Sequence, residues 1–187
     1  MATDQEVRGS TPLGRTGLID KKTAERKLSV QIATHETWME LAYREAEKAY
    51  ERDEVPIGAV VVAGSRIIGK GHNMVESLQD PTAHAEMIAL TAASDYLGSW
   101  RLDNAVLYVT KEPCPMCAGA IYLSRIPHVV FGVSDTRMGA CGSAIDLLHN
   151  STLHSNVAVT VGILEPKCLG ILQTFFQKLR ENEKPER

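Results

Sequence analysis

The sequence predicts a three-layer α/β/α domain in which helices cover both faces of a mixed five-stranded sheet. The first observation is a continuously apolar segment, residues 57–62, which is typical of a strand buried on both faces. The second is Ala63-Gly64-Ser65, which can turn this strand back into another. The third is the order strand, helix, strand over residues 106–133, which favours two parallel strands. One antiparallel and one parallel pair make the sheet mixed.

The order of the elements follows from apolar periodicity and from the residues that begin and end helices. Thr34 can cap a first helix over residues 34–51, and Pro56 separates this helix from the first strand. We expect the remaining elements in this order: strands at 57–62 and 66–71, a helix at 83–97, a strand at 106–110, a helix at 114–124, a strand at 128–133, a short helix at 144–149, a strand at 157–161 and a helix at 166–180.

The expected folded domain covers residues 34–183, with a short C-terminal tail at residues 184–187. Residues 1–33 have no sustained apolar period, which predicts a flexible N-terminal extension or a weak helix near residues 21–27. This extension holds six basic and four acidic side chains. Such a charge can attract RNA weakly, although a solvated tail is the simpler interpretation.

Composition and charge exclude several classes of protein. A length of 187 residues suits one domain, and 44% hydrophobic and 23% charged residues are ordinary for a globular chain. No apolar run approaches the ~18 residues of a membrane helix, and the first residues lack a secretory signal. We therefore expect a cytoplasmic protein with no membrane partner. The net charge of −3 gives no global support for nucleic-acid binding, so RNA contacts must come from a local patch.

Two short motifs, residues 81–86 and 112–117, hold most of the reactive side chains. They supply one imidazole, two thiols and one further carboxylate, from His84, Cys114, Cys117 and Glu86. Zinc favours nitrogen and thiolate ligands, and a catalytic zinc keeps three protein ligands and an open fourth position. The imidazole and the thiols make up that set. The carboxylate is not needed as a ligand and is therefore free to move protons.

The spacing of the two cysteines suits a metal site. Cys-x-x-Cys places both sulfur atoms on one face of a short helix that begins at Cys114 and Pro115. A helix N-terminus also favours the thiolate over the thiol. Both metal-bearing helices are expected to begin near one end of the sheet, where α/β folds place their ligands. In this order the motifs match the signature of zinc-dependent nucleobase deaminases, whose glutamate is the general acid and base.

Other interpretations of the cysteines remain open at this point. The metal could be a structural zinc with Cys141 as its fourth ligand, or Cys114 and Cys117 could form a redox pair. Disulfide frameworks belong to small secreted chains, so Cys141 and Cys168 are expected to be packed free thiols.

Several residues outside the two motifs are candidates for substrate contacts. Asn73 closes the second strand, where it is either a plain turn residue or a contact to base and sugar. The glycine-punctuated loop at residues 135–143 is too polar for a core and can rim a pocket. Core packing is the commoner fate of two aromatic residues such as Phe175 and Phe176, but adjacent residues on one helix cannot both point inward. One of the two rings is therefore a candidate to stack on an unpaired base.

The chain from about Thr34 to Arg180 resembles the bacterial tRNA adenosine deaminase family, which has the cytidine-deaminase fold. The segments shared with guanine and cytosine deaminases as well are residues 55–60, 80–86 and 112–121. The segments similar to the tRNA-acting branch are residues 124–126, 130–133, 139–143 and 146–149, together with Asp135 and Phe175-Phe176.

This resemblance implies hydrolytic deamination of the wobble adenosine in a tRNA anticodon stem-loop to inosine, with release of ammonia. The expected enzyme is a homodimer with one zinc ion per subunit, bound by His84, Cys114 and Cys117, and with Glu86 as acid and base. The substrate-binding residues that the resemblance implies are Asn73, Asp135, Phe175 and Phe176. A loop nucleotide is already partly unstacked, which favours an anticodon loop over a duplex.

Two alternatives use the same zinc site. One is a small-molecule deaminase that acts on guanine, cytosine or a nucleotide. The other is a non-catalytic zinc scaffold, although a scaffold has no use for the carboxylate of Glu86.

Overall fold

A five-stranded sheet forms the centre of the molecule, with the strand order β2-β1-β3-β4-β5. The computed structural model describes residues 21–153 and 155–182, with side chains from His35 onward. The strands are β1 (Gly58–Ala63), β2 (Arg66–His72), β3 (Ala105–Lys111), β4 (His128–Val133) and β5 (Ala158–Val161). The helices are α1 (Lys21–Tyr50), α2 (Val75–Leu78), α3 (Ala85–Leu97), α4 (Pro115–Leu123) and α5 (Glu165–Asn182).

The sheet is mixed, as predicted. β1 pairs antiparallel with both β2 and β3. β3 pairs parallel with β4, and β4 pairs parallel with β5. The crossover from β3 to β4 runs through α4, which is the expected βαβ unit, so the N-terminus of α4 lies at the carboxyl end of β3.

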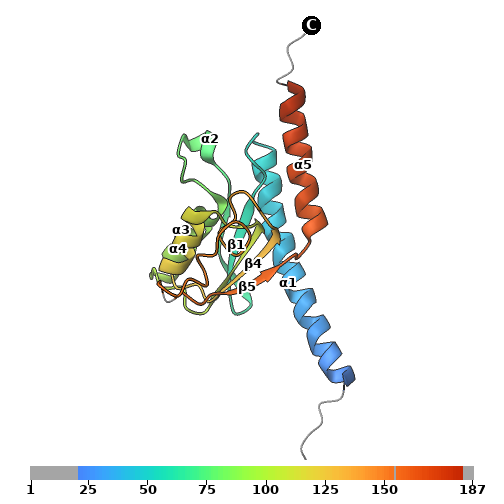
Figure 1. Ribbon diagram of the computed structural model, residues 1–187, viewed down its shortest axis with the longest axis vertical. Helices are drawn as coiled ribbons and strands as arrows, with labels where there is room; N and C mark the ends of the chain where they lie inside the picture. Colours follow the sequence, from blue (N-terminus) through green and yellow to red (C-terminus); the bar gives the residue numbers. More distant parts are fainter. Residues whose placement is uncertain (1–20, 154, 183–187) are drawn as a thin grey trace, which may run out of the picture.

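Helices cover both faces of the sheet, with α3 and α4 on one side and α1 and α5 on the other (Figure 1). The side chains of β1 explain why its sequence is continuously apolar. Ala59 and Val61 belong to the core cluster under α3 and α4, whereas Val60 and Val62 belong to the cluster under α1 and α5. Both faces of this strand are therefore buried, as expected for a central strand of a three-layer fold.

Three features differ from the prediction. The helix expected at residues 144–149 is wrong, because the amides of Ala144 and Ile145 both donate to the carbonyl of Gly139 and a bridge pairs Cys141 with Asp146. The first helix begins at Lys21 and not at residue 34, so that the helix considered for residues 21–27 is present and continues without a break into the helix expected from residue 34. The short helix α2 was not predicted at all. The predictions for residues 1–20 and for the tail at 184–187 lie outside the described residues.

None of the helices in the described ranges combines the length and the apolar character that a membrane span requires.

Glycines in β2 allow α3 to approach the sheet closely. A Cβ added at Gly71 would lie 2.3 Å from the carbonyl oxygen of Ala85, and one at Gly69 would lie 2.2 Å from that of Ala89. Both contacts are to helix backbone, which cannot rotate away as a side chain can. The first turn of α3 is therefore seated directly on β2.

We expect Gly71→Ala to lower the free energy of unfolding by about 1–3 kcal/mol or more, since the new methyl group forces α3 off the sheet. Gly170→Ala is the matched control, because nothing lies within 4 Å of the added methyl group on α5. There, the better helix propensity of alanine raises stability by up to about 1 kcal/mol. Urea unfolding of the two variants checks this, and equal stabilities would contradict the close contact.

Candidate active site

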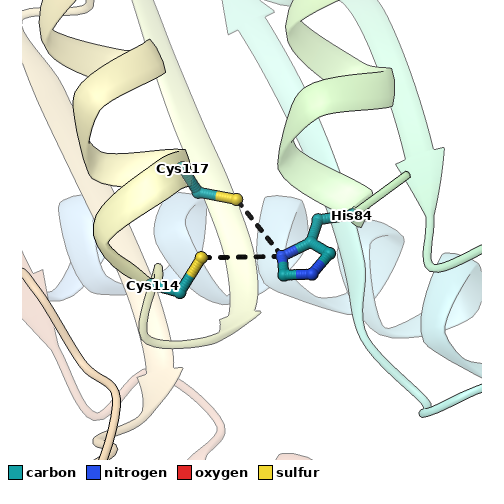
Figure 2. Close-up of side chains that lie close together, drawn as sticks. All are labelled: His84, Cys114 and Cys117. Carbon is teal, nitrogen blue, oxygen red and sulfur yellow. Dashed lines mark hydrogen bonds between the residues drawn. The ribbon is translucent and has the colours of Figure 1, made fainter. Parts of the chain in front are cut away.

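Three side chains with metal-binding atoms converge where α3 and α4 begin (Figure 2). His84 is the N-cap residue of α3 and Cys114 is the N-cap residue of α4, with Pro115 at the first helical position. The Nδ1 atom of His84 lies 3.6 Å from the Sγ atom of Cys114 and 3.5 Å from that of Cys117. All three ligand atoms lie within 4.8 Å of one another.

The donor set fits zinc. One imidazole nitrogen and two sulfur atoms at this separation match a catalytic site with three protein ligands and one open position. Cys141 is buried but is not part of the group, and the described residues supply no fourth donor. A structural four-ligand site with Cys141 is thus not what the side chains form.

The protonation of Cys114 suits metal binding. A hydrogen bond with Cys117, with a further one from His84, lowers the pKa of Cys114 to about 3. The same hydrogen bond with Cys114, together with burial, raises the pKa of Cys117. Cys114 is therefore a thiolate at neutral pH, which is the form that ligates a metal.

Glu86 is the carboxylate nearest in sequence to these donors and lies in the first turn of α3. It is buried, and it is not a member of the ligand group. Burial raises the pKa of Glu86 above the ordinary value of a carboxyl group. A raised pKa brings a carboxyl group closer to the range in which it can both accept and release a proton at neutral pH.

A cavity of about 520 Å³ adjoins His84, a size typical of small-ligand sites. Its walls come from the segment between α1 and β1, from the β2–α2 connection and the first residues of α2, from the N-cap residue of α3 and from α5. The lining residues are Asp53, Glu54, Val55, Ile57, Asn73, Val75, Glu76, His84, Phe175 and Leu179. Of the predicted substrate-binding residues, Asn73 and Phe175 line this cavity, whereas Asp135 and Phe176 do not.

Comparison with known proteins identifies the family. Residues 33–180 match the family model of the MafB19-like deaminases. The tRNA-specific adenosine deaminase of Bacillus subtilis (strain 168) is 47% identical over 152 residues, which cover 81% of this chain and 94% of that protein. The chain belongs to the tRNA-specific adenosine deaminase family. The resemblance of its motifs to this family is thereby confirmed.

Solved structures of deaminases show the same fold. One, from biochemical and structural studies of A-to-I editing by tRNA:A34 deaminases at the wobble position, has a TM-score of 0.70 and 44% identity. It covers 73% of this chain and 99% of its own. The guanine deaminase of Bacillus subtilis has a TM-score of 0.52 and 32% identity, and it covers 82% of this chain and 97% of its own. The predicted deaminase fold is confirmed.

In this deaminase, Glu112 holds the loop of residues 134–143 beside the metal ligands. Its buried carboxylate accepts the backbone N–H groups of Asp135 at 2.8 Å, Cys141 at 3.0 Å and Ser143 at 3.1 Å. Glu112 opens the motif at residues 112–117, but the motif alone does not indicate a role for it. Its position could have indicated a structural role, because an acidic side chain directly after a buried strand needs several hydrogen-bond donors.

Both carboxylate oxygens of Asp135 already have partners within the protein. One carboxylate oxygen accepts the N–H groups of Arg137 at 2.9 Å and Met138 at 3.2 Å, and the other pairs with the ammonium group of Lys111. Burial alone would raise the pKa of Asp135, but the hydrogen bond from Lys111 and the Arg137 amide lower it. Its role in substrate binding stays a prediction, and its partner Lys111 was not expected from the sequence.

The two phenylalanines of α5 point in different directions. Phe175 is 3% exposed and packs edge to face against Tyr50, with ring centroids 6.1 Å apart. Phe176 is 41% exposed. The expectation that only one of the two rings can face inward is confirmed, and Phe176 is the ring that solvent reaches.

Proposed function

We propose that the protein is a zinc-dependent enzyme that deaminates adenosine to inosine at the wobble position of a tRNA anticodon loop, with release of ammonia. The observation that carries this proposal is the convergence of His84, Cys114 and Cys117, with the buried carboxyl group of Glu86 next to Cys117, where His84 also lines a cavity of nucleoside size. The identity of 47% to a tRNA-specific adenosine deaminase supports the choice of substrate.

His84, Cys114 and Cys117 are the residues that would hold one zinc ion per subunit. When it is bound, zinc would act as a Lewis acid and lower the pKa of its bound water molecule from about 15.7 to roughly 7. Glu86 accepts a proton from the attacking water as the oxygen adds to C6 of adenine. The same carboxyl group passes this proton to the ring nitrogen, then takes the second proton of the water from the hydroxyl group formed on C6 and donates it to the amino group, which leaves as ammonia.

The cavity walls suit a nucleoside that has been turned out of a loop. Asn73 offers an amide, and Phe175 offers an aromatic face on the same cavity. The exposed ring of Phe176 offers a surface on which a neighbouring base can stack, and Asp135 lies in the loop that Glu112 anchors. A base in an anticodon loop is easier to extrude than one in a duplex.

We also propose that the enzyme is a cytoplasmic homodimer that pairs through α3 and α4. An apolar groove of about 370 Å³ is lined by side chains of these two helices and by Trp100. At its edges Trp100 is 60% exposed and Leu123 is 67% exposed. A contiguous apolar patch of this kind is typical of a protein interface.

We expect Leu123→Glu to shift the protein from dimer to monomer, because it places a charge in the apolar contact. Light scattering after size-exclusion chromatography measures the mass. Leu169→Glu is the control, since this exposed leucine lies on α5, on the opposite side of the sheet. A wild-type monomer, or equal loss in both variants, would contradict this interface.

The experiment for the proposed function is to map inosine by position. Zinc-loaded protein is incubated with an anticodon stem-loop that carries adenosine at the wobble position, and inosine is located by sequencing. Two control substrates carry guanosine at the wobble position or adenosine only at the neighbouring loop positions. Inosine at the wobble position alone is expected, and inosine at other positions or none at all would contradict the proposal.

A further inference from the structure

Glu54 is a buried carboxylate in the cavity wall that has no part in the reaction steps described above. It is 0% exposed and follows the end of α1. Its two oxygens accept hydrogen bonds from Nδ2 of Asn73 at 3.1 Å, from the N–H of Glu76 at 3.2 Å and from the N–H of Ser77 at 2.7 Å. In the described residues no lysine or arginine pairs with it, so these three donors are what stabilise the buried charge.

The bond between Glu54 and Asn73 determines which end of the amide faces the cavity. A carboxylate only accepts hydrogen bonds, so the NH₂ group of Asn73 must be turned toward Glu54. The Oδ1 atom is left on the other edge of the amide, and no donor within the described chain reaches it. An asparagine without such a partner can present either end to a ligand.

The carboxyl group of Glu54 stays ionised at neutral pH. Burial alone would raise the pKa of Glu54, but the hydrogen bonds from Ser77, Glu76 and Asn73 outweigh burial and lower it. The group therefore remains an acceptor, and the orientation that it imposes on Asn73 persists.

We propose that Glu54 is a positioning residue that holds the Asn73 amide with its carbonyl oxygen toward the nucleoside. The site then selects a hydrogen-bond donor, a hydroxyl or N–H group of the nucleoside, at that position. This inference rests on the proposed function, since it takes Asn73 to be a substrate contact. It adds a second buried acid to the site, one that acts through Asn73 and not on the reacting atoms.

The first test is a double-mutant cycle. Glu54→Gln replaces one acceptor oxygen by an NH₂ group, which frees the Asn73 amide to turn. We expect kcat/KM for the anticodon stem-loop to fall by about 10- to 100-fold, mainly through KM. In an Asn73→Ala background the same change is expected to cost less than about 2-fold, because no amide is left to position. If Glu54 only anchored the backbone of residues 76–77, Glu54→Gln would lower kcat/KM by the same factor in the wild-type and Asn73→Ala backgrounds.

The second test exchanges the two groups. In the double variant Glu54→Gln/Asn73→Asp, the new glutamine can donate to the new aspartate, which presents an oxygen to the cavity. We expect kcat/KM to recover by about 5-fold or more over Glu54→Gln alone. This variant also keeps one carboxylate and one amide in the buried pair, so it is compared with the wild type if Glu54→Gln does not fold. A kcat/KM within about 10-fold of the wild type is then expected, and a loss of about 100-fold or more would overturn the positioning role.

The outcomes separate this inference from the proposed function. A wild-type protein that makes no inosine would contradict the function itself. A wild-type protein that is active, with an unaffected Glu54→Gln variant, additive effects in the cycle or a wild-type KM for Asn73→Ala, would overturn the positioning role. Zinc content and melting temperature are measured for every variant. The variants of the double-mutant cycle are expected to match the wild type in both.

Discussion

Glu86→Gln is expected to lower kcat by about 10²- to 10⁴-fold, the range that general acid–base catalysis contributes. Glutamine keeps the size of the side chain but cannot take up the proton of water or return it to the departing amine. The buried position of Glu86 means that bulk solvent cannot easily replace it. Single-turnover formation of inosine measures the effect.

Zinc content is the control for this variant. Glu86 is not a member of the ligand group, so Glu86→Gln is expected to keep one zinc ion per chain by atomic absorption. A variant that holds zinc and retains wild-type kcat would remove Glu86 from the mechanism. It would also favour the scaffold interpretation.

Cys117→Ser is expected to abolish both zinc binding and deamination. Cys117 is one of only three donors in the group, and its buried side chain cannot be replaced by another ligand of the described chain. Loss of partners outside the ligand set already costs about 10- to 100-fold in metal affinity or activity, so loss of a ligand should cost more. Metal content after dialysis and inosine formation are measured together.

Cys141→Ala is the matched control for the ligand variant. Cys141 is also buried in the same region, but its thiol does not belong to the group of donors. Burial raises the pKa of Cys141 well above that of an ordinary thiol, as expected for a packed and unreactive cysteine. Zinc content and activity are expected to stay within about 3-fold of the wild type, as is usual for substitutions that touch no ligand. Loss of zinc from this variant would restore the four-ligand alternative.

The sheet could be predicted from sequence because each strand is indicated by the residues of its own segment. A run of apolar residues at 57–62 can be buried on both faces only in the middle of a layered fold, and the structure divides those residues between two cores. The segment at 144–149 could not be predicted in the same way. Its backbone bonds to residues 139 and 140, and Leu148 enters the core, so tertiary contacts override its helical pattern.

The candidate site likewise contains residues that the sequence indicates and residues that only the folded structure identifies. The convergence of His84, Cys114 and Cys117 was predictable because a zinc site would constrain both residue type and spacing, and the two motifs satisfy those constraints within a few residues. Glu54 and Glu112 were not predictable as supports. Their partners are amides 19 to 31 residues away along the chain, and only the folded structure brings them within hydrogen-bond distance.

The most direct test of the central claim is a comparison of ammonia release from two substrates by one zinc-loaded preparation. One substrate is an anticodon stem-loop with adenosine at the wobble position, and the other is free guanine, the substrate class of the related guanine deaminase. A kcat/KM for the stem-loop that exceeds the value for guanine by about 100-fold or more is the predicted result. Efficient release from guanine with none from the stem-loop would contradict the claim and reassign the same site to a free base.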